Sequence, residues 1–172
     1  INAAINAAAD GDTIIVGPGT YPETVTMAKN DLHLIGNGPD KTFIVGSIQG
    51  VYFPNNKYGE VGGFNIKGGT THAIHLPGGN GGSIIHNNVI SGSGGVGIYS
   101  YNTEVKVINN VISYNPSSGF QEGLSDANEI SNNIIHSNGG WGIVNGQSQY
   151  NNVYGNTAGT MTGVTISVGD IS

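Results

Sequence analysis

The chain has 172 residues, enough for one domain with a hydrophobic core and too few for two domains of ordinary size. It contains no cysteine and only five basic residues, all of them lysine, so disulfides and cysteine-ligated metals are excluded. The net charge of −6 leaves no basic surface for phosphates, which argues against a nucleic-acid partner, and no apolar run is long enough to span a membrane. Glycine is abundant, at 30 residues, but a hydrophobic content of 37% indicates a folded chain rather than a disordered one.

The N-terminal segment predicts a helix over residues 1–10. Its apolar residues recur at the spacing of an amphipathic helix, at Ile1, Ala4, Ile5, Ala8 and Ala9. The helix is expected to stop at Asp10-Gly11-Asp12, and the first strand begins at Thr13. We expect this helix to cover the open end of the first coil, whose unpaired backbone groups would otherwise pair with another chain.

Two series of apolar markers repeat along the chain with one period. A motif of two asparagines and two apolar residues recurs, and its last residues are Ile90, Ile112, Ile135 and Tyr154, in steps of 22, 23 and 19. Weaker copies place Ile66 and Ile44 before them, in steps of 24 and 22. A second series keeps the steps of 24, 22 and 23, through Ile74, Ile98, Phe120 and Ile143. Two markers with a common period predict a repeat architecture.

Each repeat predicts short strands rather than helices. The markers lie in short segments of β-branched and aromatic residues bounded by Gly, Asn and Ser, which interrupt every helical run. The leucine pattern of a leucine-rich repeat is missing. Two or three strands per repeat form one coil of a parallel β-solenoid, so we predict a single all-β domain over residues 1–172, with coils from 13 to 168.

Because coils of a solenoid stack about 4.8 Å apart, equivalent residues of successive repeats lie above one another. The two marker series therefore predict two interior columns of apolar side chains. The second asparagine of each motif predicts a hydrogen-bonded ladder at one corner, through Asn88, Asn110, Asn133 and Asn152.

The C-terminal segment predicts a strand without a cap. Residues 164–168 alternate as a strand does, and no helical pattern follows. We expect either that the chain is a fragment of a larger extracellular protein that continues past Ser172, or that the open C-terminal coil is used for self-association with a neighbouring chain.

The sequence resembles a known superfamily over essentially its whole length. The N-terminal part, with Ala4–Ile14, Gly17-Pro18-Gly19-Thr20-Tyr21, Glu23 and Leu34-Ile35-Gly36-Asn37-Gly38, is similar to the start of pectin methylesterases. The later Asn-Asn-x-Ile repeats resemble the coils of the pectin-lyase-like right-handed parallel β-helix superfamily. The resemblance implies a single-stranded right-handed parallel β-helix, here of about seven coils with an N-terminal capping α-helix. It is specific for fold and not for function.

The catalytic motifs of several enzyme families in that superfamily are absent. Pectin methylesterases share aspartates in Gln-Asp and Asp-Phe-Ile-Phe-Gly contexts and an arginine, and polygalacturonase-like hydrolases carry Asn-Thr-Asp and Asp-Asp elements. Many pectate lyases use an arginine base, and this chain has no arginine. A lyase with a lysine base and calcium remains as the catalytic alternative, with Lys106, Glu122 and Asp126 as candidate catalytic residues.

Residues 121–129 form the densest acidic segment. Glu122, Asp126 and Glu129 offer the carboxylate oxygens that calcium prefers, so calcium is the one cofactor the sequence suggests. The spacing matches no calcium-loop pattern, and a solvated loop is the simpler interpretation. The five histidines stand beside no matching carboxylate motif, so no transition-metal site is predicted.

An outward-facing aromatic surface is the main candidate for binding. If Ile98 points inward, period-two alternation points Tyr99 outward, above His75 and beside Gln121, with Tyr101 close by in sequence. These residues predict a surface on which sugars stack, and the alternative is an ordinary exposed sheet face.

These observations favour a non-catalytic module, extracellular or on the cell surface, with a structural or carbohydrate-contacting role. Its expected partner is a polysaccharide or a cell-surface glycan. The alternative is a polysaccharide-active enzyme, either a calcium-dependent lyase or a hydrolase of an acidic polysaccharide such as pectate.

Overall fold

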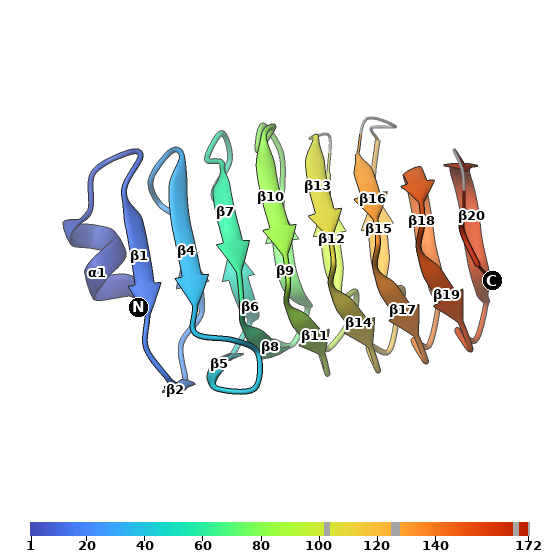
Figure 1. Ribbon diagram of the computed structural model, residues 1–172, viewed down its shortest axis with the longest axis horizontal. Coiled ribbons are helices and arrows are strands. Elements are labelled where there is room, and N and C mark those ends of the chain that lie inside the picture. Colours follow the sequence, from blue (N-terminus) through green and yellow to red (C-terminus); the bar gives the residue numbers. More distant parts are fainter. Residues whose placement is uncertain (102–103, 125–127, 167–168, 172) are drawn as a thin grey trace.

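The computed structural model shows a chain wound into a parallel β-helix, whose coils follow one another from the N-terminal helix to the C-terminus (Figure 1). The structure describes residues 1–101, 104–124, 128–166 and 169–171. In these residues all strand pairs are parallel, and the strands line three faces. One face has seven strands, one per turn, so the prediction of a right-handed parallel β-helix of about seven coils is confirmed.

Three faces enclose the core. Face 1 contains β1 (Thr13–Val16), β4 (Leu32–Gly36), β7 (Gly59–Gly62), β10 (Ser83–His86), β13 (Val105–Ile108) and β16 (Glu129–Ser131). Face 2 contains β2 (Gly19–Tyr21), β5 (Thr42–Gly46), β8 (Asn65–Gly68), β11 (Val89–Ser91), β14 (Val111–Ser113), β17 (Ile134–His136) and β19 (Asn152–Tyr154). Face 3 contains β3 (Val25–Thr26), β6 (Gln49–Tyr52), β9 (His72–Leu76), β12 (Ile98–Ser100) and β15 (Phe120–Glu122).

The last two long strands close the corner between faces 3 and 1. β18 (Trp141–Gln149) pairs with β15 through its first half and with β16 through its second half. It therefore joins the two faces into one sheet of 13 strands. β20 (Gly159–Ile166) pairs with β18 along both halves.

The N-terminal helix is present but shorter than predicted. Helix α1 runs from Asn2 to Ala7 and ends because Ala8 adopts an extended conformation. It buries Ile5 completely, and the Asn2 side chain fastens it to the first coil by accepting from the Thr26 N–H and donating to the Thr24 carbonyl. Among the described residues no helix has the length and apolar character required to cross a membrane.

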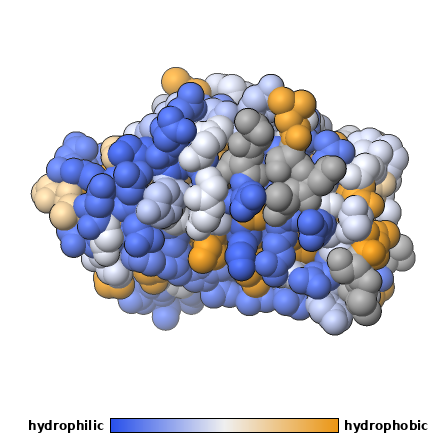
Figure 2. Space-filling model, turned by 90° about the horizontal axis from the view of Figure 1, so that it is seen from above, coloured by the Kyte–Doolittle hydropathy of each residue, from blue (hydrophilic) through white to orange (hydrophobic). Residues whose placement is uncertain are grey.

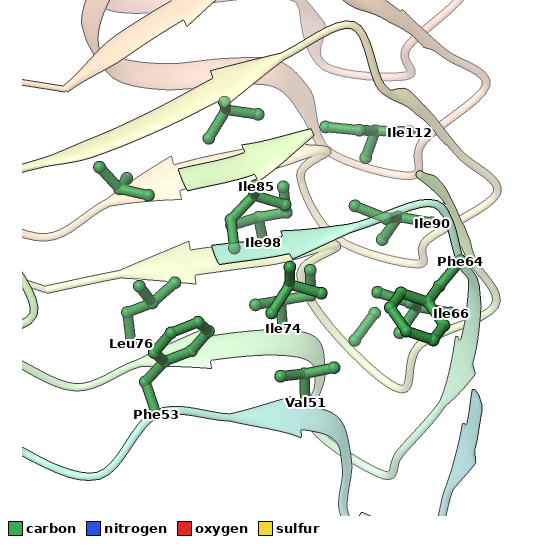
Figure 3. Packing of buried hydrophobic residues seen from close by; sticks show 14 of the residues in the cluster. Val51, Phe53, Phe64, Ile66, Ile74, Leu76, Ile85, Ile90, Ile98 and Ile112 are labelled. Atoms are coloured by element: carbon green, nitrogen blue, oxygen red, sulfur yellow. The ribbon is translucent and has the colours of Figure 1, made fainter. Parts of the chain in front are cut away.

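The predicted interior columns are confirmed. Ile66, Ile90, Ile112 and Ile135 are in register on face 2, and Ile74, Ile98, Phe120 and Ile143 on face 3, all fully buried. Figure 3 shows members of both columns in the interior, with Ile66, Ile90 and Ile112 from face 2 and Ile74 and Ile98 from face 3. Each coil adds a set of β-branched or aromatic side chains that only its neighbours can bury, so the core extends along the whole axis.

The asparagine ladder is confirmed in its first three members and wrong in its fourth. The amide oxygen of Asn110 accepts from the Asn88 N–H, and that of Asn133 accepts from the Asn110 N–H. The next member is Asn151, whose amide oxygen accepts from the Asn133 N–H, whereas Asn152 is exposed and pairs with Ile134.

The physical reason lies in the residue that precedes each ladder asparagine. Asn87, Asn109 and Asn132 hold left-handed backbone with φ of 54–58°, and in the last turn Tyr150 takes that place with φ of 56°. The Asn-Asn pair of the last turn therefore begins one residue later in the coil than the earlier pairs, and its first member enters the ladder. Ile135 pairs with Val153, not with Tyr154.

A second ladder, which sequence reasoning missed, stands at the corner between faces 2 and 3. Asn115 accepts from the Ser93 N–H, Asn138 from the Asn115 N–H, and Asn156 from the Asn138 N–H. Together the two ladders satisfy buried backbone groups where the chain turns between strands.

Candidate functional site

Three of the four predicted sugar-binding residues, His75, Tyr99 and Gln121, lie in one outward column of face 3. His75 pairs with Tyr99, and Tyr99 pairs with Gln121, in the register that the repeat predicted. Each side chain is partly exposed, and each follows a buried neighbour on its strand. The register extends this column, which we call the face-3 column, over seven coils: Thr26, Tyr52, His75, Tyr99, Gln121, Val144 and Thr162.

Aromatic and imidazole rings pack against one another in the middle of the face-3 column. The ring of Tyr99 stacks on that of His72, with centroids 4.8 Å apart and planes 14° apart. His75 lies against both Tyr99 and Tyr52, with centroids at 5.6 and 5.7 Å. The amide nitrogen of Gln49 lies 3.1 Å from Nδ1 of His75 and holds that ring in place.

Sequence reasoning missed Gln49, Tyr52 and His72. Tyr52 had a signal available, because it occupies the position of His75 one coil earlier. Gln49 and His72 pair with each other at the start of their strands, where the chain turns and simple alternation fails.

The two histidines of this cluster are uncharged at neutral pH. Burial, and then the nearby His75, lower the pKa of His72 to about 4. Burial also lowers the pKa of His75. Nδ1 of His72 is buried and has no hydrogen-bond partner. The cluster therefore presents neutral rings and amides rather than charges.

Tyr101 is placed beside, not in, the face-3 column. It follows the end of β12 and is 40% exposed. Its ring lies over Gly123 of the next coil, where an added Cβ would come within 2.2 Å of the ring. The Tyr101 ring therefore packs directly against the backbone of Gly123, which covers one of its faces.

The catalytic and calcium candidates are divided between two faces. Lys106 is on the outside of face 1, where its ammonium lies 3.4 Å from the Glu129 carboxylate. Both line a depression with Gly82 and Glu104. Glu122 instead ends β15 on face 3, with its carboxylate buried and accepting from the Leu124 N–H and the Asn128 amide. Asp126 lies outside the described residues.

Two further side-chain clusters were not predicted. On face 1, the Glu60 carboxylate accepts from His33 Nδ1 and His86 Nε2, both at 2.5 Å. Burial opposes ionisation of Glu60, but these hydrogen bonds outweigh it and lower its pKa. On face 2, His136 stacks on Tyr154 with centroids 5.1 Å apart. Both clusters join residues that are distant in sequence and meet only because the coils stack.

Hydrophilic residues cover most of the surface seen in Figure 2 between the N-terminal tip and the middle of the molecule, and the hydrophobic residues form separate groups. Exposed large hydrophobic residues are likewise scattered over different coils, as with Ile15, Ile48 and Tyr114. Isolated residues of this kind are normal at a protein surface.

A protein-family profile described as "Periplasmic copper-binding protein (NosD)" matches residues 5–168. The chain belongs to the NosD family. A search of curated protein sequences found no match to this NosD chain.

Solved structures similar to this NosD chain include two modules from Azotobacter vinelandii. The A-module of the mannuronan C-5 epimerase AlgE4 has a TM-score of 0.63 and 16% identity, and the alignment covers 96% of this chain and 68% of the module. The A-module of the mannuronan C-5 epimerase AlgE6 has a TM-score of 0.38 and 15% identity, covering 96% and 74%. At such identities the AlgE4 likeness shows the fold alone.

The family description names copper, and the described residues of this NosD chain do not fit a copper centre. They contain no group of three or more His, Asp or Glu side chains arranged to hold one metal ion. His33 and His86 both direct a ring nitrogen to Glu60 rather than to a common point. The soft ligands that favour copper are also scarce, because the chain has no cysteine and only two methionines. Met27 is fully buried, and Met161 is partly buried against the core.

Proposed function

We propose that this NosD-family β-helix is a non-catalytic carbohydrate-contacting module of the cell envelope. The observation that carries the proposal is the face-3 column, in which Tyr52, His75, Tyr99 and Gln121 follow one another on successive coils. Aromatic rings offer flat apolar faces to sugars, and amide and imidazole groups bond to hydroxyls. The periplasmic description of the family supports a place in the cell envelope.

The separation of the candidate catalytic groups favours binding over catalysis. Lys106 is paired with Glu129 on face 1, while Glu122 is buried at the end of a face-3 strand. A general base and the acidic group that works with it must both reach the reacting atoms of one substrate, at hydrogen-bond distance or through one water. For the enzyme alternative, Lys106 and Glu122 would have to lie on the same face, close to one substrate.

Affinity electrophoresis through gels containing single polysaccharides tests the proposal. We expect at least one polysaccharide to retard the protein, and we expect Tyr99→Ala to weaken that retardation about tenfold, since the stacked ring is lost. Tyr154→Ala is the matched control, because it removes an exposed tyrosine from a strand of face 2. Equal losses in the two variants, or no retardation by any polymer, would contradict binding at face 3.

Incubation with pectate and alginate, with and without calcium, tests the catalytic alternative. A lyase produces unsaturated sugars that absorb in the ultraviolet, and a hydrolase produces new reducing ends. The proposal predicts neither product. Formation of either one by the purified protein, and its loss in Lys106→Ala, would replace the binding role by an enzymatic one.

Self-association through the C-terminal coil is a second candidate role. In the described residues β20 pairs only with β18, and Ile166 and Ile171 are exposed on this coil. An unpaired strand edge is a template for another chain. If so, light scattering should show a molar mass that rises with protein concentration over a hundredfold range, and Ile166→Lys should reduce this rise. A constant monomer mass at all concentrations would exclude this role.

A further inference from the structure

The face-3 column contains no aspartate, glutamate, lysine or arginine along its whole length. Its seven members are two threonines, two tyrosines, a histidine, a glutamine and a valine. Gln49 and His72, which flank the column, are also uncharged polar residues at neutral pH. A ligand that lies along this column therefore meets only neutral groups.

The cations of the protein are placed elsewhere. Its five basic residues are lysines, and none occurs in a strand of face 3: they are Lys29, Lys41, Lys57, Lys67 and Lys106. Lys67 is on β8 of face 2 and Lys106 is on β13 of face 1. Lys106 is also neutralised by Glu129.

An anionic polysaccharide is poorly matched to such a surface. A carboxylate that leaves water needs a cationic or multiply donating partner, which proteins normally supply as arginine or lysine. The net charge of −6 adds a long-range repulsion between the protein and a polyanion. A neutral sugar carries neither penalty.

A neutral polysaccharide matches the groups that are present. The apolar face of a pyranose ring packs on Tyr52 or Tyr99, and its hydroxyls exchange hydrogen bonds with Gln121 and with the imidazoles. Successive coils place one column residue about every 4.8 Å, so a chain of sugars running along the helix axis meets an uncharged side chain at each step.

We infer that face 3 selects neutral polysaccharides over uronate polymers. The inference rests on the proposed carbohydrate-binding function and specifies its ligand class. Two observations support it: the column has no charged side chain, and the chain has a net charge of −6.

The test compares retardation in gels that contain galactomannan, hydroxyethylcellulose or dextran with retardation in gels that contain polygalacturonate or alginate, at neutral pH and low salt. We expect at least one neutral polymer to retard the protein, at least about tenfold more strongly than either uronate polymer. Retardation by uronates alone would overturn the inference and leave carbohydrate binding standing. Retardation by none of the five polymers would overturn both.

A gain-of-function variant gives an independent readout. Gln121→Lys introduces a cation into the middle of the face-3 column and should create retardation by polygalacturonate that falls as salt is raised. Ile134→Lys is the matched control, because it adds the same charge to an exposed strand position of face 2. If both variants gain uronate binding equally, net charge alone governs binding and the inference fails.

Discussion

The asparagine ladder provides the sharpest test of the stability of this β-helix. Asn110 is 1% exposed. Its oxygen accepts from the N–H of Asn88 at 3.0 Å, and its amide donates to the carbonyl of Ile85 at 2.9 Å and to the oxygen of Asn133 at 3.1 Å. Asn110→Ala removes the side-chain partner of two buried backbone groups, each costing about 1–3 kcal/mol when left unsatisfied.

We therefore expect Asn110→Ala to lower the free energy of unfolding by about 3 kcal/mol, and Tm by roughly 6–12 °C for a chain of this size. Asn152→Ala is the control, because Asn152 belongs to the same sequence motif but is exposed, and it should change stability by less than about 0.5 kcal/mol. Urea unfolding followed by circular dichroism measures both. Equal losses of unfolding free energy in the two variants would refute the conclusion that the buried asparagine of each coil forms the stabilising ladder.

Two more predictions concern close packing and pH. Gly36→Ala should lower the free energy of unfolding by at least about 2 kcal/mol, because the new Cβ would lie 2.3 Å from the Gly63 carbonyl oxygen. Gly81→Ala is the control, because its Cβ would meet nothing within 4 Å and should change stability by less than about 0.5 kcal/mol. Similar melting temperatures for the two variants would contradict this prediction. The pKa of His72, lowered to about 4, means that the unfolded chain binds more protons than the folded one between about pH 4 and 6.5, so stability falls as pH is lowered through this range. Since His72 is only half-buried and partly screened by solvent, its share of this loss of stability is roughly 1–2 kcal/mol. His72→Gln should therefore flatten the pH profile of the free energy of unfolding by that amount. An unchanged profile would show that His72 is not responsible.

The face-3 column shows how far the period alone can predict a site. Once Ile74, Ile98 and Phe120 are aligned by their spacing, the next residue on each strand must face outward, so His75, Tyr99 and Gln121 were predictable as neighbours. Neither the stacking of His72 on Tyr99 nor the bond from Gln49 to His75 follows from that alignment. Both involve residues at a bend, where inward and outward positions no longer alternate.

The same limit explains the error in the last coil and the separation of two of the catalytic candidates. The motif repeated its two asparagines, but Tyr150 took the left-handed corner position, which changed the asparagine that faces inward. Lys106 and Glu122 lie on different faces, because the chain passes from β13 on face 1 through β14 on face 2 before it reaches β15 on face 3.

By itself the sequence determined the architecture of this protein. A recurring pattern of apolar residues and asparagines requires that equivalent positions stack, and stacking requires parallel strands, interior columns and side-chain ladders. Only the tertiary structure decided which side chains meet across coils and faces, as in the bridge from His33 through Glu60 to His86. Such contacts depend on the lengths and bends of the corners and on side-chain rotamers, and a period carries no information about either.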